Sequence, residues 1–312
     1  MTRISIPDDS PPVLTASGVW PTLKSRAEIE YHNTLPYSEE ALIERIRDAE
    51  VVLNIRSSSR FTARVFQACP KLRLLSVWGT GTDHIDLPAA VRFGVTVTNT
   101  PGVAAISIAE HALALLFAVA RRIPQMDAAT RRGNWERGQF VQLRGKTCGV
   151  VGYGAIGREF ARLAAGIGMR PLLWTMHPER YPGVDFSGLM ELYSTSDVIS
   201  LHLRLSPDTE NFVAQSQFDL MKPGVILINT ARGAIVHEAS LVAALSQGRI
   251  AGAGLDVFTT EPLPREHPLI GLGNVVMTPH CAGITPEALE AGLAMAVANI
   301  WAFLNGAPQR VV

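Results

Sequence analysis

The sequence predicts an α/β protein in which two domains are each built on a parallel sheet with crossover helices. Two observations support this prediction. Short apolar segments recur along the chain, and segments of helical periodicity lie between them. The chain has 312 residues, 47% of them hydrophobic, which is long for one compact domain and sufficient for two large cores. A disordered chain is excluded on the same grounds.

Most of the apolar segments are nearly continuous, which is typical of strands that helices cover on both faces. The predicted strands are Val51–Ile55, Leu72–Trp78, Val95–Thr98, Thr147–Val151, Leu172–Trp174, Val198–Leu203, Val225–Ile228, Ala253–Val257 and Val275–Met277. The predicted helices are Ser38–Arg47, Ser107–Arg122, Arg158–Ala165, Ala239–Gln247 and Pro286–Leu304. The long helix 107–122 separates two sets of strands, and the last helix is expected to return to the first set. The predicted domains are therefore residues 1–103 plus 285–312, and residues 104–284.

Charge and cysteine content exclude several classes of protein. Lys plus Arg number 28, as do Asp plus Glu, so no basic excess supports nucleic-acid binding. Cys69, Cys148 and Cys281 are far apart and predict neither a disulfide framework nor a zinc cage, and no metal is expected. The N-terminus lacks a secretory apolar segment, and the apolar run Ala112–Ala120 is too short to span a bilayer. The expected location is cytoplasmic, without membrane contact.

A glycine-rich turn follows the strand predicted at 147–151. Gly152, Gly154 and Gly157 form the pattern G-x-G-x-x-G and open a predicted helix, and a further strand follows. In such a unit the first glycine allows a tight turn, the second admits a pyrophosphate and the third allows close packing of helix on strand. The free N–H groups of the helix then bind the phosphates. A purely structural turn is the alternative, but the complete strand–helix–strand context favours dinucleotide binding.

The end of the next strand bears on the choice of dinucleotide. Where NAD-binding chains place a carboxylate for the ribose hydroxyl, this chain has the neutral Thr175. His177 and Arg180 follow and are candidates for binding a 2′-phosphate, although both also fit solvated loop positions. The sequence therefore favours NADP(H) and leaves NAD(H) open.

Three residues that suit the reduction of a keto acid follow strands of the second set. Arg232, Glu261 and His280 belong to segments at strand ends, where open parallel sheets bind ligands. A guanidinium binds a substrate carboxylate in a bidentate manner, and an imidazolium donates a proton to a developing alkoxide. A carboxylate beside the imidazole orients it and favours its charged form.

These residues lie in motifs that resemble the D-isomer-specific 2-hydroxyacid dehydrogenases, which include phosphoglycerate dehydrogenases and glyoxylate/hydroxypyruvate reductases. The resemblance runs from about Val51 to the C-terminus. Besides the glycine turn and the segments of Glu261 and His280, it is carried by the segments 79–86 (GTGTDHID), 99–102 (NTPG) and 221–233 (MKPGVILINTARG).

The resemblance implies a Rossmann-type doubly wound sheet for the cofactor, a smaller flavodoxin-like substrate domain and a homodimer with an arm near Trp135. It implies that Arg232 binds substrate, that Glu261 supports His280 and that His280 is the acid/base. The amides of Thr80 and Gly81 would accept the substrate carboxylate, and Asp256 would hold the nicotinamide carboxamide. The remaining expected contacts are Ala155, Ile156 and Thr230 for the cofactor and Arg56 for the substrate.

Some positions depart from the family pattern or have a structural alternative. Arg204 stands where proline is frequent, and Ala104 where asparagine is common. Arg56 and Trp78 suit either the substrate pocket or the core of the first domain. Cys281 is expected to pack, because neighbours in a strand point to opposite faces and His280 would then point elsewhere.

The prediction is an oxidoreductase that transfers a hydride between NAD(P)H and a 2-oxo acid, giving a D-2-hydroxy acid. One rival is a corepressor-like protein of the same fold that senses dinucleotides with little turnover; the absence of long appended tails disfavours it. The other is a methyltransferase that uses S-adenosylmethionine, which would require a carboxylate in place of Thr175 and no Arg232 or His280.

Overall fold

The structure is a computed structural model that describes residues 1–312 and divides into two compact units. Unit 1 comprises Met1–Ala104 and Ile284–Val312, and unit 2 comprises Ala105–Gly283. Each boundary lies one residue from the position expected from the sequence. Unit 1 is therefore built from two separate stretches of chain, whereas unit 2 is continuous.

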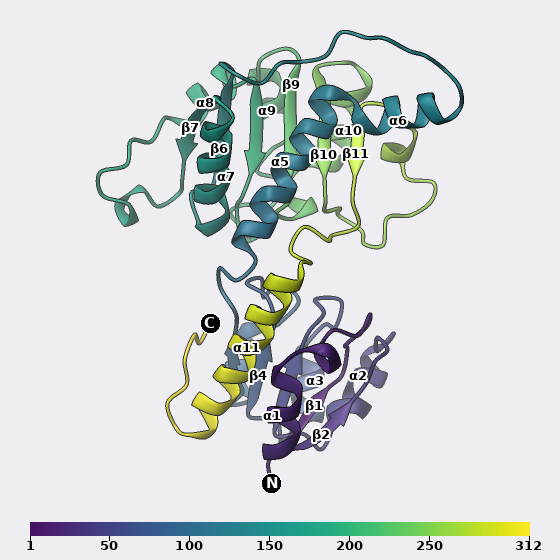
Figure 1. Ribbon diagram of the computed structural model, residues 1–312. Helices are drawn as coiled ribbons and strands as arrows, with labels where there is room; N and C mark the ends of the chain where they lie inside the picture. Colours follow the sequence, from purple (N-terminus) through teal and green to yellow (C-terminus); the bar gives the residue numbers. More distant parts are fainter. The chain divides into compact units, whose positions relative to one another are not determined.

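Unit 1 has a parallel sheet of five strands in the order β2-β1-β3-β4-β5 (Figure 1). Counted along the chain, this is the flavodoxin-like order 2-1-3-4-5. Its strands are β1 (Arg3–Ile6), β2 (Glu28–Tyr31), β3 (Val51–Asn54), β4 (Leu74–Val77) and β5 (Thr96–Thr98). Its helices are the 3₁₀ turn η1 (Leu14–Ala16), α1 (Val19–Arg26), α2 (Glu39–Ile46), α3 (Ala63–Ala68), α4 (Leu87–Arg92) and α11 (Pro286–Leu304).

Helices cover both faces of this sheet, so side chains that alternate between the two faces along β3 are buried on each side. Val51 and Leu53 pack in a core with α1 and α11, whereas Val52 packs with α2, α3 and α4 on the other face. All three valine and leucine side chains are fully buried. The sequence of β3 is a continuous apolar run for this reason.

Helix α11 is the one helix long and apolar enough to cross a membrane by length and composition. Its side chains Leu293, Ala296 and Ile300 are buried against the strands of unit 1. The hydroxyl of Ser76 on β4 also donates a hydrogen bond of 2.9 Å to the carbonyl of Ala296. These contacts identify α11 as a core helix of unit 1.

Unit 2 has a parallel sheet of six strands in the order β11-β10-β9-β8-β6-β7. The direction of winding reverses between β6 and β8, which makes the carboxyl end of β6 the topological switch point. The order is thus 2-1-3-4-5-6 within the unit, rather than the 3-2-1-4-5-6 of the dinucleotide-binding prototype. The strands are β6 (Thr147–Val151), β7 (Arg170–Trp174), β8 (Val198–Leu201), β9 (Val225–Asn229), β10 (Ile250–Leu255) and β11 (Val275–Met277).

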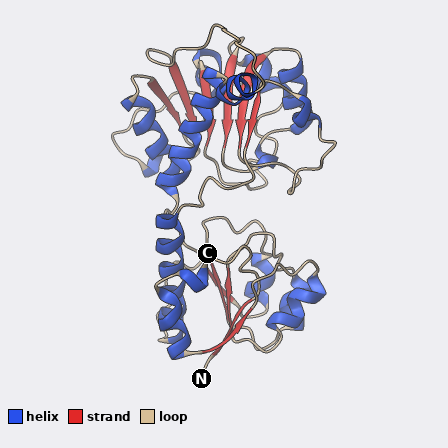
Figure 2. Ribbon diagram, turned by 45° about the vertical axis from the view of Figure 1, so that its right-hand side comes forward, coloured by secondary structure: helices blue, strands red, loops and turns tan.

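The helices of unit 2 also lie on both faces of its sheet (Figure 2). Val150 packs against α5 and α7, and Val151 packs in the core of α8, α9 and α10. The helices are α5 (Ala105–Arg121), α6 (Ile123–Arg131), α7 (Ala155–Gly166), α8 (Leu189–Thr195), α9 (Gln215–Leu220) and α10 (Glu238–Ser246). Three short 3₁₀ helices complete the unit: η2 (Pro178–Arg180), η3 (Gly233–Ile235) and η4 (Pro268–Gly271).

The predicted fold class is confirmed, and each predicted strand overlaps an observed one from β3 to β11. The strands β1 and β2 were not predicted, because their segments RISI and EIEY alternate polar and apolar residues. The helix predicted at 107–122 ends at Arg121, because Arg122 adopts a left-handed conformation with φ 51° and α6 then starts at Ile123, with Pro124 in its first turn.

Candidate active site

The glycine turn lies at the switch point of unit 2, directly after β6. Gly152 has φ +103°, and a Cβ atom there would lie 2.6 Å from the carbonyl oxygen of His202. A Cβ atom on Gly157 would lie 1.9 Å from the oxygen of Gly152, so α7 can approach β6 only with glycine at this position. A Cβ atom on Gly154, in contrast, would have no neighbour within 4 Å. Two of the three glycines are thus required by the fold, and the middle one leaves open space.

The N-terminus of α7 follows this turn and has no side-chain cap, since its N-cap residue is Gly154. The first N–H groups of a helix have no partner within the helix, and here they belong to Ala155, Ile156 and Gly157. Such amides, together with the positive end of the helix dipole, suit a phosphate group. The site therefore fits the pyrophosphate of a dinucleotide.

Thr175 follows β7 directly, and its hydroxyl accepts a hydrogen bond of 3.3 Å from the amide of His177. His177 and Arg180 lie 3.3 Å and 3.9 Å from the carboxylate of Glu179. All three of these charged or titratable side chains are more than half exposed. The carboxylate of Glu179 thus lies beside both candidate cations, His177 and Arg180. The prediction from the sequence did not take this negative charge into account.

Arg232 follows β9 in a loop that the side chain of Asn229 fixes. The side-chain amide of Asn229 donates to the carbonyl of Arg232 at 2.9 Å and its oxygen accepts from the amide of Ala231 at 3.0 Å. A Cβ atom on Gly233 would lie 2.0 Å from the carbonyl carbon of Phe258, so glycine allows this loop to pack on the loop after β10. The neighbouring Thr230 has a buried hydroxyl without a hydrogen-bond partner.

Glu261 and His280 form a close pair in unit 2. Nδ1 of His280 lies 2.7 Å from Oε2 of Glu261, and Oε1 of Glu261 accepts a hydrogen bond of 2.9 Å from the amide of Phe258. About one third of each side chain is exposed, 36% for His280 and 35% for Glu261. Because the carboxylate accepts the proton on Nδ1, the Nε2 atom is left to exchange a proton with a ligand.

The environment of Glu261 favours its ionised form. Burial is the largest single influence and would raise the pKa of this carboxyl. The hydrogen bond and charge of His280, the Phe258 amide and the charge of Arg232 together outweigh burial and hold the pKa below its ordinary value. The charge of Arg232 therefore acts on the same carboxylate that orients His280.

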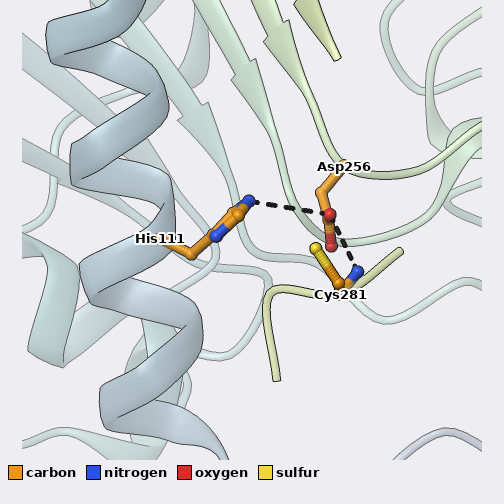
Figure 3. Close-up of side chains that lie close together, drawn as sticks. All are labelled: His111, Asp256 and Cys281. Atoms are coloured by element: carbon orange, nitrogen blue, oxygen red, sulfur yellow. Dashed lines mark hydrogen bonds and ion pairs between the residues drawn. The ribbon is translucent and has the colours of Figure 1, made fainter. Parts of the chain in front are cut away.

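Asp256 follows β10 and is the most buried carboxylate of this region, with 1% of its side chain exposed. It accepts hydrogen bonds of 2.9 Å from the amides of both Cys281 and Ala282, and one of 2.6 Å from the hydroxyl of Thr278. Nε2 of His111 on α5 lies 2.9 Å from this hydroxyl. The same atom lies 3.6 Å from Oδ1 of Asp256 (Figure 3). Thr278 was not among the residues predicted from the sequence, although it directly follows β11.

Cys281 was expected to pack because residues 280 and 281 were taken to lie in one strand. That assumption is wrong. β11 ends at Met277, and His280 has a left-handed backbone with φ 51°, so residues 280 and 281 are not neighbours in a strand. Cys281 is partly exposed and lies beside Asp256 and His111 rather than in a core (Figure 3).

The candidate substrate residues of unit 1 follow β4. The amide of Gly79 donates to the hydroxyl of Thr100 at 2.7 Å, and the side-chain amide of Asn99 donates to the carbonyl of Thr80 at 2.9 Å. Thr80 is exposed and Gly81 is partly exposed. The loop is therefore held from behind by the segment after β5, and it presents Thr80 and Gly81 at the carboxyl edge of the sheet.

Arg56 and Trp78 are both engaged within unit 1. The guanidinium of Arg56 donates to the carbonyl of Pro11, burial lowers its pKa, and the charges of Asp9 and Asp8 oppose that effect. The indole of Trp78 packs on α11, where a Cβ atom on Gly292 would lie 2.1 Å from Nε1. The structure thus supports the core alternative for Trp78.

Comparison with known proteins identifies the chain. The family described as D-isomer specific 2-hydroxyacid dehydrogenase, NAD binding domain, matches residues 113–282. A glyoxylate reductase of Korarchaeum cryptofilum is 39% identical over 281 residues, which cover 87% of this chain and 84% of that protein. The chain belongs to the D-isomer specific 2-hydroxyacid dehydrogenase family. It is an NAD(P)-dependent enzyme of that family, as its sequence predicted.

Further relatives within the family carry different names. A D-3-phosphoglycerate dehydrogenase of Archaeoglobus fulgidus is 40% identical over 88% of this chain, which spans only 53% of that longer protein. The solved structure of the TT0316 protein from Thermus thermophilus has a TM-score of 0.91 and 37% identity, with both chains fully covered. An acyclic imino acid reductase, Bsp5, in complex with NADPH and D-Arg has a TM-score of 0.92 and 32% identity, again over both full chains.

Proposed function

We propose that the protein reduces a 2-oxo acid to a D-2-hydroxy acid with NAD(P)H, and that His280 is its acid/base catalyst. The reaction is 2-oxo acid plus NAD(P)H plus a proton giving D-2-hydroxy acid plus NAD(P)⁺. The observation that supports the proposal most directly is the 2.7 Å contact between His280 and Glu261, in the same unit as Arg232 and the glycine turn. A glyoxylate reductase among the relatives makes glyoxylate and hydroxypyruvate the first substrates to test.

The proposed roles follow from the chemistry of each side chain. Arg232 binds the substrate carboxylate and polarises the adjacent carbonyl, because its guanidinium remains charged and matches a planar carboxylate. His280, with Nδ1 held by Glu261, donates the proton on Nε2 to the oxygen of the forming alcohol and takes it back in the reverse direction. Glu261 orients the imidazole and stabilises its charged form. In unit 1, the amides of Thr80 and Gly81 would bind the substrate carboxylate, with Arg56 as a further candidate contact.

The cofactor contacts are proposed from features of unit 2. The uncapped N-terminus of α7 and the open space at Gly154 suit the pyrophosphate, and the unpartnered hydroxyl of Thr230 suits a polar group of the ligand. Asp256 would accept a hydrogen bond from the nicotinamide carboxamide. When bound, the dinucleotide supplies or accepts the hydride.

We further propose that NADPH is preferred to NADH, because Thr175 would not repel a 2′-phosphate as a carboxylate would. His177 and Arg180 supply positive charge in this proposal, with Glu179 as an opposing charge. The variant T175D is expected to lose most of its turnover with NADPH and to retain it with NADH. A clear preference of the wild type for NADH would refute this part.

We also propose a homodimer, because Trp135 is 78% exposed in a segment without regular structure that resembles the family's dimer arm. The molar mass in solution, measured by light scattering, tests this proposal. The cytoplasmic location stays a prediction from the sequence.

The central test is a panel of 2-oxo acids assayed with both reductants, for the wild type and for H280A, R232A and E261Q. Loss of the acid is expected to lower kcat of H280A by about 10²- to 10⁴-fold with dinucleotide affinity unchanged. R232A is expected to raise KM for the oxo acid as well as to lower kcat, and E261Q to lower kcat by a smaller factor. Turnover of H280A or R232A near that of the wild type would overturn the residue assignment.

The rivals considered from the sequence give different results in the same panel. A methyltransferase is excluded by family membership. A dinucleotide-sensing corepressor-like protein would bind the dinucleotide but turn over every oxo acid slowly, with little difference between the wild type and H280A.

A further inference from the structure

Three side chains that bind transition metals meet in unit 2. His111 comes from α5, Asp256 follows β10 and Cys281 follows β11, and their ligand atoms all lie within 4.8 Å of one another (Figure 3). Because these residues are far apart along the chain, the cysteine spacing that predicted no metal could not reveal them. The fold alone brings them together.

The donor set suits zinc. Imidazole nitrogen, carboxylate oxygen and thiolate sulfur are the three ligand types that Zn²⁺ takes in proteins, and sites with three protein ligands keep a fourth position for water. Nε2 of His111 and Oδ1 of Asp256 are 3.6 Å apart. Two such atoms bound to one tetrahedral zinc lie about 3.4 Å apart, given bond lengths of about 2.0–2.1 Å.

The surroundings support a cation at this point. Asp256 is buried, and its only ion-pair partner is His111, which is charged only when protonated. The amide of Ala282 donates to Oδ2 of Asp256, and the amide of Cys281 and the hydroxyl of Thr278 donate to Oδ1, so outer hydrogen bonds orient the carboxylate as they do around metal ligands. The side chain of His111 is 24% exposed and Cys281 is partly exposed, so the ion has a path from solvent.

We propose that His111, Asp256 and Cys281 form a Zn²⁺ site, and that zinc and the dinucleotide exclude each other there. Zinc replaces the thiol proton of Cys281, which is released to solvent, and His111 exchanges its hydrogen bond to Thr278 for the metal. The exclusion rests on the proposed function, in which Asp256 holds the nicotinamide carboxamide. Zinc is then an inhibitor that competes with the dinucleotide.

Direct binding is tested on metal-free protein without dinucleotide. Zinc is titrated by calorimetry, and cobalt is titrated while thiolate-to-metal charge-transfer absorption is recorded. The matched variants are C281A and C69A, because Cys69 is buried at 1% exposure and remote in sequence from the cluster. We expect one zinc per chain in the wild type and C69A, and at least about tenfold weaker binding with no charge-transfer band in C281A.

H111Q serves as a second variant that retains the thiol, with circular dichroism to confirm its fold. It is also expected to bind zinc at least about tenfold more weakly. Equal zinc affinity in the wild type and C281A, or no cobalt–thiolate band in the wild type, would overturn the site.

The exclusion is tested by zinc inhibition at several dinucleotide concentrations, with reversal by a chelator. We expect zinc to raise the apparent KM for the dinucleotide in the wild type and in C69A, and to have little effect on C281A. Zinc that binds these residues without raising that KM would overturn the exclusion and the assignment of Asp256, and would leave the metal site standing. Failure of zinc to bind would overturn the site and leave the dependence of turnover on His280 intact.

Discussion

The two units share a strand order but differ in which groups lie at the switch point of the sheet. Counted within each unit, both sheets begin with the strand order 2-1-3-4-5, so each has a crevice where the winding reverses. In unit 1 this crevice lies at the end of β1, and in unit 2 at the end of β6. Parallel strand ends and helix N-termini present N–H groups there that require an acceptor.

In unit 1, carboxylate side chains of the unit itself accept hydrogen bonds from these N–H groups. Asp8, fully buried after β1, accepts hydrogen bonds of 2.9 Å from the amide of Ile55 and 2.5 Å from the side chain of Asn54. Asp9 accepts from the amides of Val13 and Leu14 at 2.9 and 3.0 Å. Four helices of this unit are also capped by side chains, at Ser38, Thr62, Asp86 and Thr285.

Unit 2 has glycines in the corresponding place and leaves the N-terminus of α7 uncapped. The same topology thus holds an internal anion in one unit and leaves donors for an external anion in the other. The strand order therefore creates a crevice whose backbone N–H groups need an acceptor. A few side chains determine whether that acceptor is part of the protein, as in unit 1, or a bound ligand.

The largest expected effect is that of a methyl group added to the glycine turn at the switch point of unit 2. In G157A the new Cβ atom would lie 1.9 Å from the oxygen of Gly152, so the turn must move. We expect dinucleotide affinity to fall by at least about 100-fold and Tm to fall as well, because a carbonyl cannot yield as a flexible side chain does. A fluorescence titration with NAD(P)H and a thermal melt measure both quantities.

G154A is the matched control, since a Cβ atom there meets nothing within 4 Å. Its Tm is expected to equal that of the wild type, while its dinucleotide affinity falls because the methyl group occupies space open to the ligand. A G154A protein as unstable as G157A would contradict the distinction between packing and binding glycines.

The second effect concerns the internal anion of unit 1. Burial, which outweighs the hydrogen bonds that Asp8 accepts from Ile55 and Asn54, raises the pKa of this carboxyl from 3.8 to about 6. The folded state therefore binds this proton more tightly than the unfolded chain. Above about pH 6, Asp8 is ionised in the folded state and the free energy of unfolding is lower. As pH falls from about 6 toward 3.8, the carboxyl is protonated and the free energy of unfolding rises by about 3 kcal/mol in all.

D8N has no group to titrate at this position. Relative to D8N, the wild type is expected to gain stability as pH falls through this window, measured by urea unfolding at several pH values. D48N gives the opposite sign, because the hydrogen bond and charge of Lys71 hold the pKa of the exposed Asp48 below its usual value. A pH-independent difference between wild type and D8N would show that Asp8 does not titrate as described.

The smallest effect tests the loop after β4. T100V removes the hydroxyl that accepts from the amide of Gly79 at 2.7 Å, at a position with 0% exposure. We expect a loss of about 1–3 kcal/mol in the free energy of unfolding. We also expect a several-fold rise in KM for the oxo acid, without a change in dinucleotide affinity.

T98V is the control for this prediction, because the buried hydroxyl of Thr98 has no hydrogen-bond partner and its removal leaves no group unsatisfied. Its stability is expected to stay close to that of the wild type. Equal losses for T98V and T100V would indicate a packing effect rather than loss of the acceptor for Gly79.

The comparison also explains what could be predicted from the sequence. The glycine turn, Arg232, Glu261 and His280 could be predicted as site residues because strand ends follow apolar runs and parallel strands end at one edge. The strands β1 and β2 were missed because Arg3, Ser5, Glu28 and Glu30 interrupt the apolar runs. The switch point of unit 1 was therefore also missed.

Contacts between segments far apart in the chain could not be predicted from the sequence. The sequence offered no signal that Thr278 and His111 meet at Asp256, because three elements must first pack together. The break at Arg122 had a local signal in Pro124, which favours the first turn of a new helix. The assigned roles of the site residues stay predictions.

The division of unit 1 into two stretches of chain has a consequence for protein synthesis. The ribosome completes every strand of unit 2 before α11 is made, whereas the sheet of unit 1 must await that helix to cover its buried face. A nascent chain halted after residue 283 would carry a full unit 2 beside a sheet with apolar side chains in water. Chaperone binding to nascent chains should therefore concentrate on the first part of the polypeptide until α11 has been made.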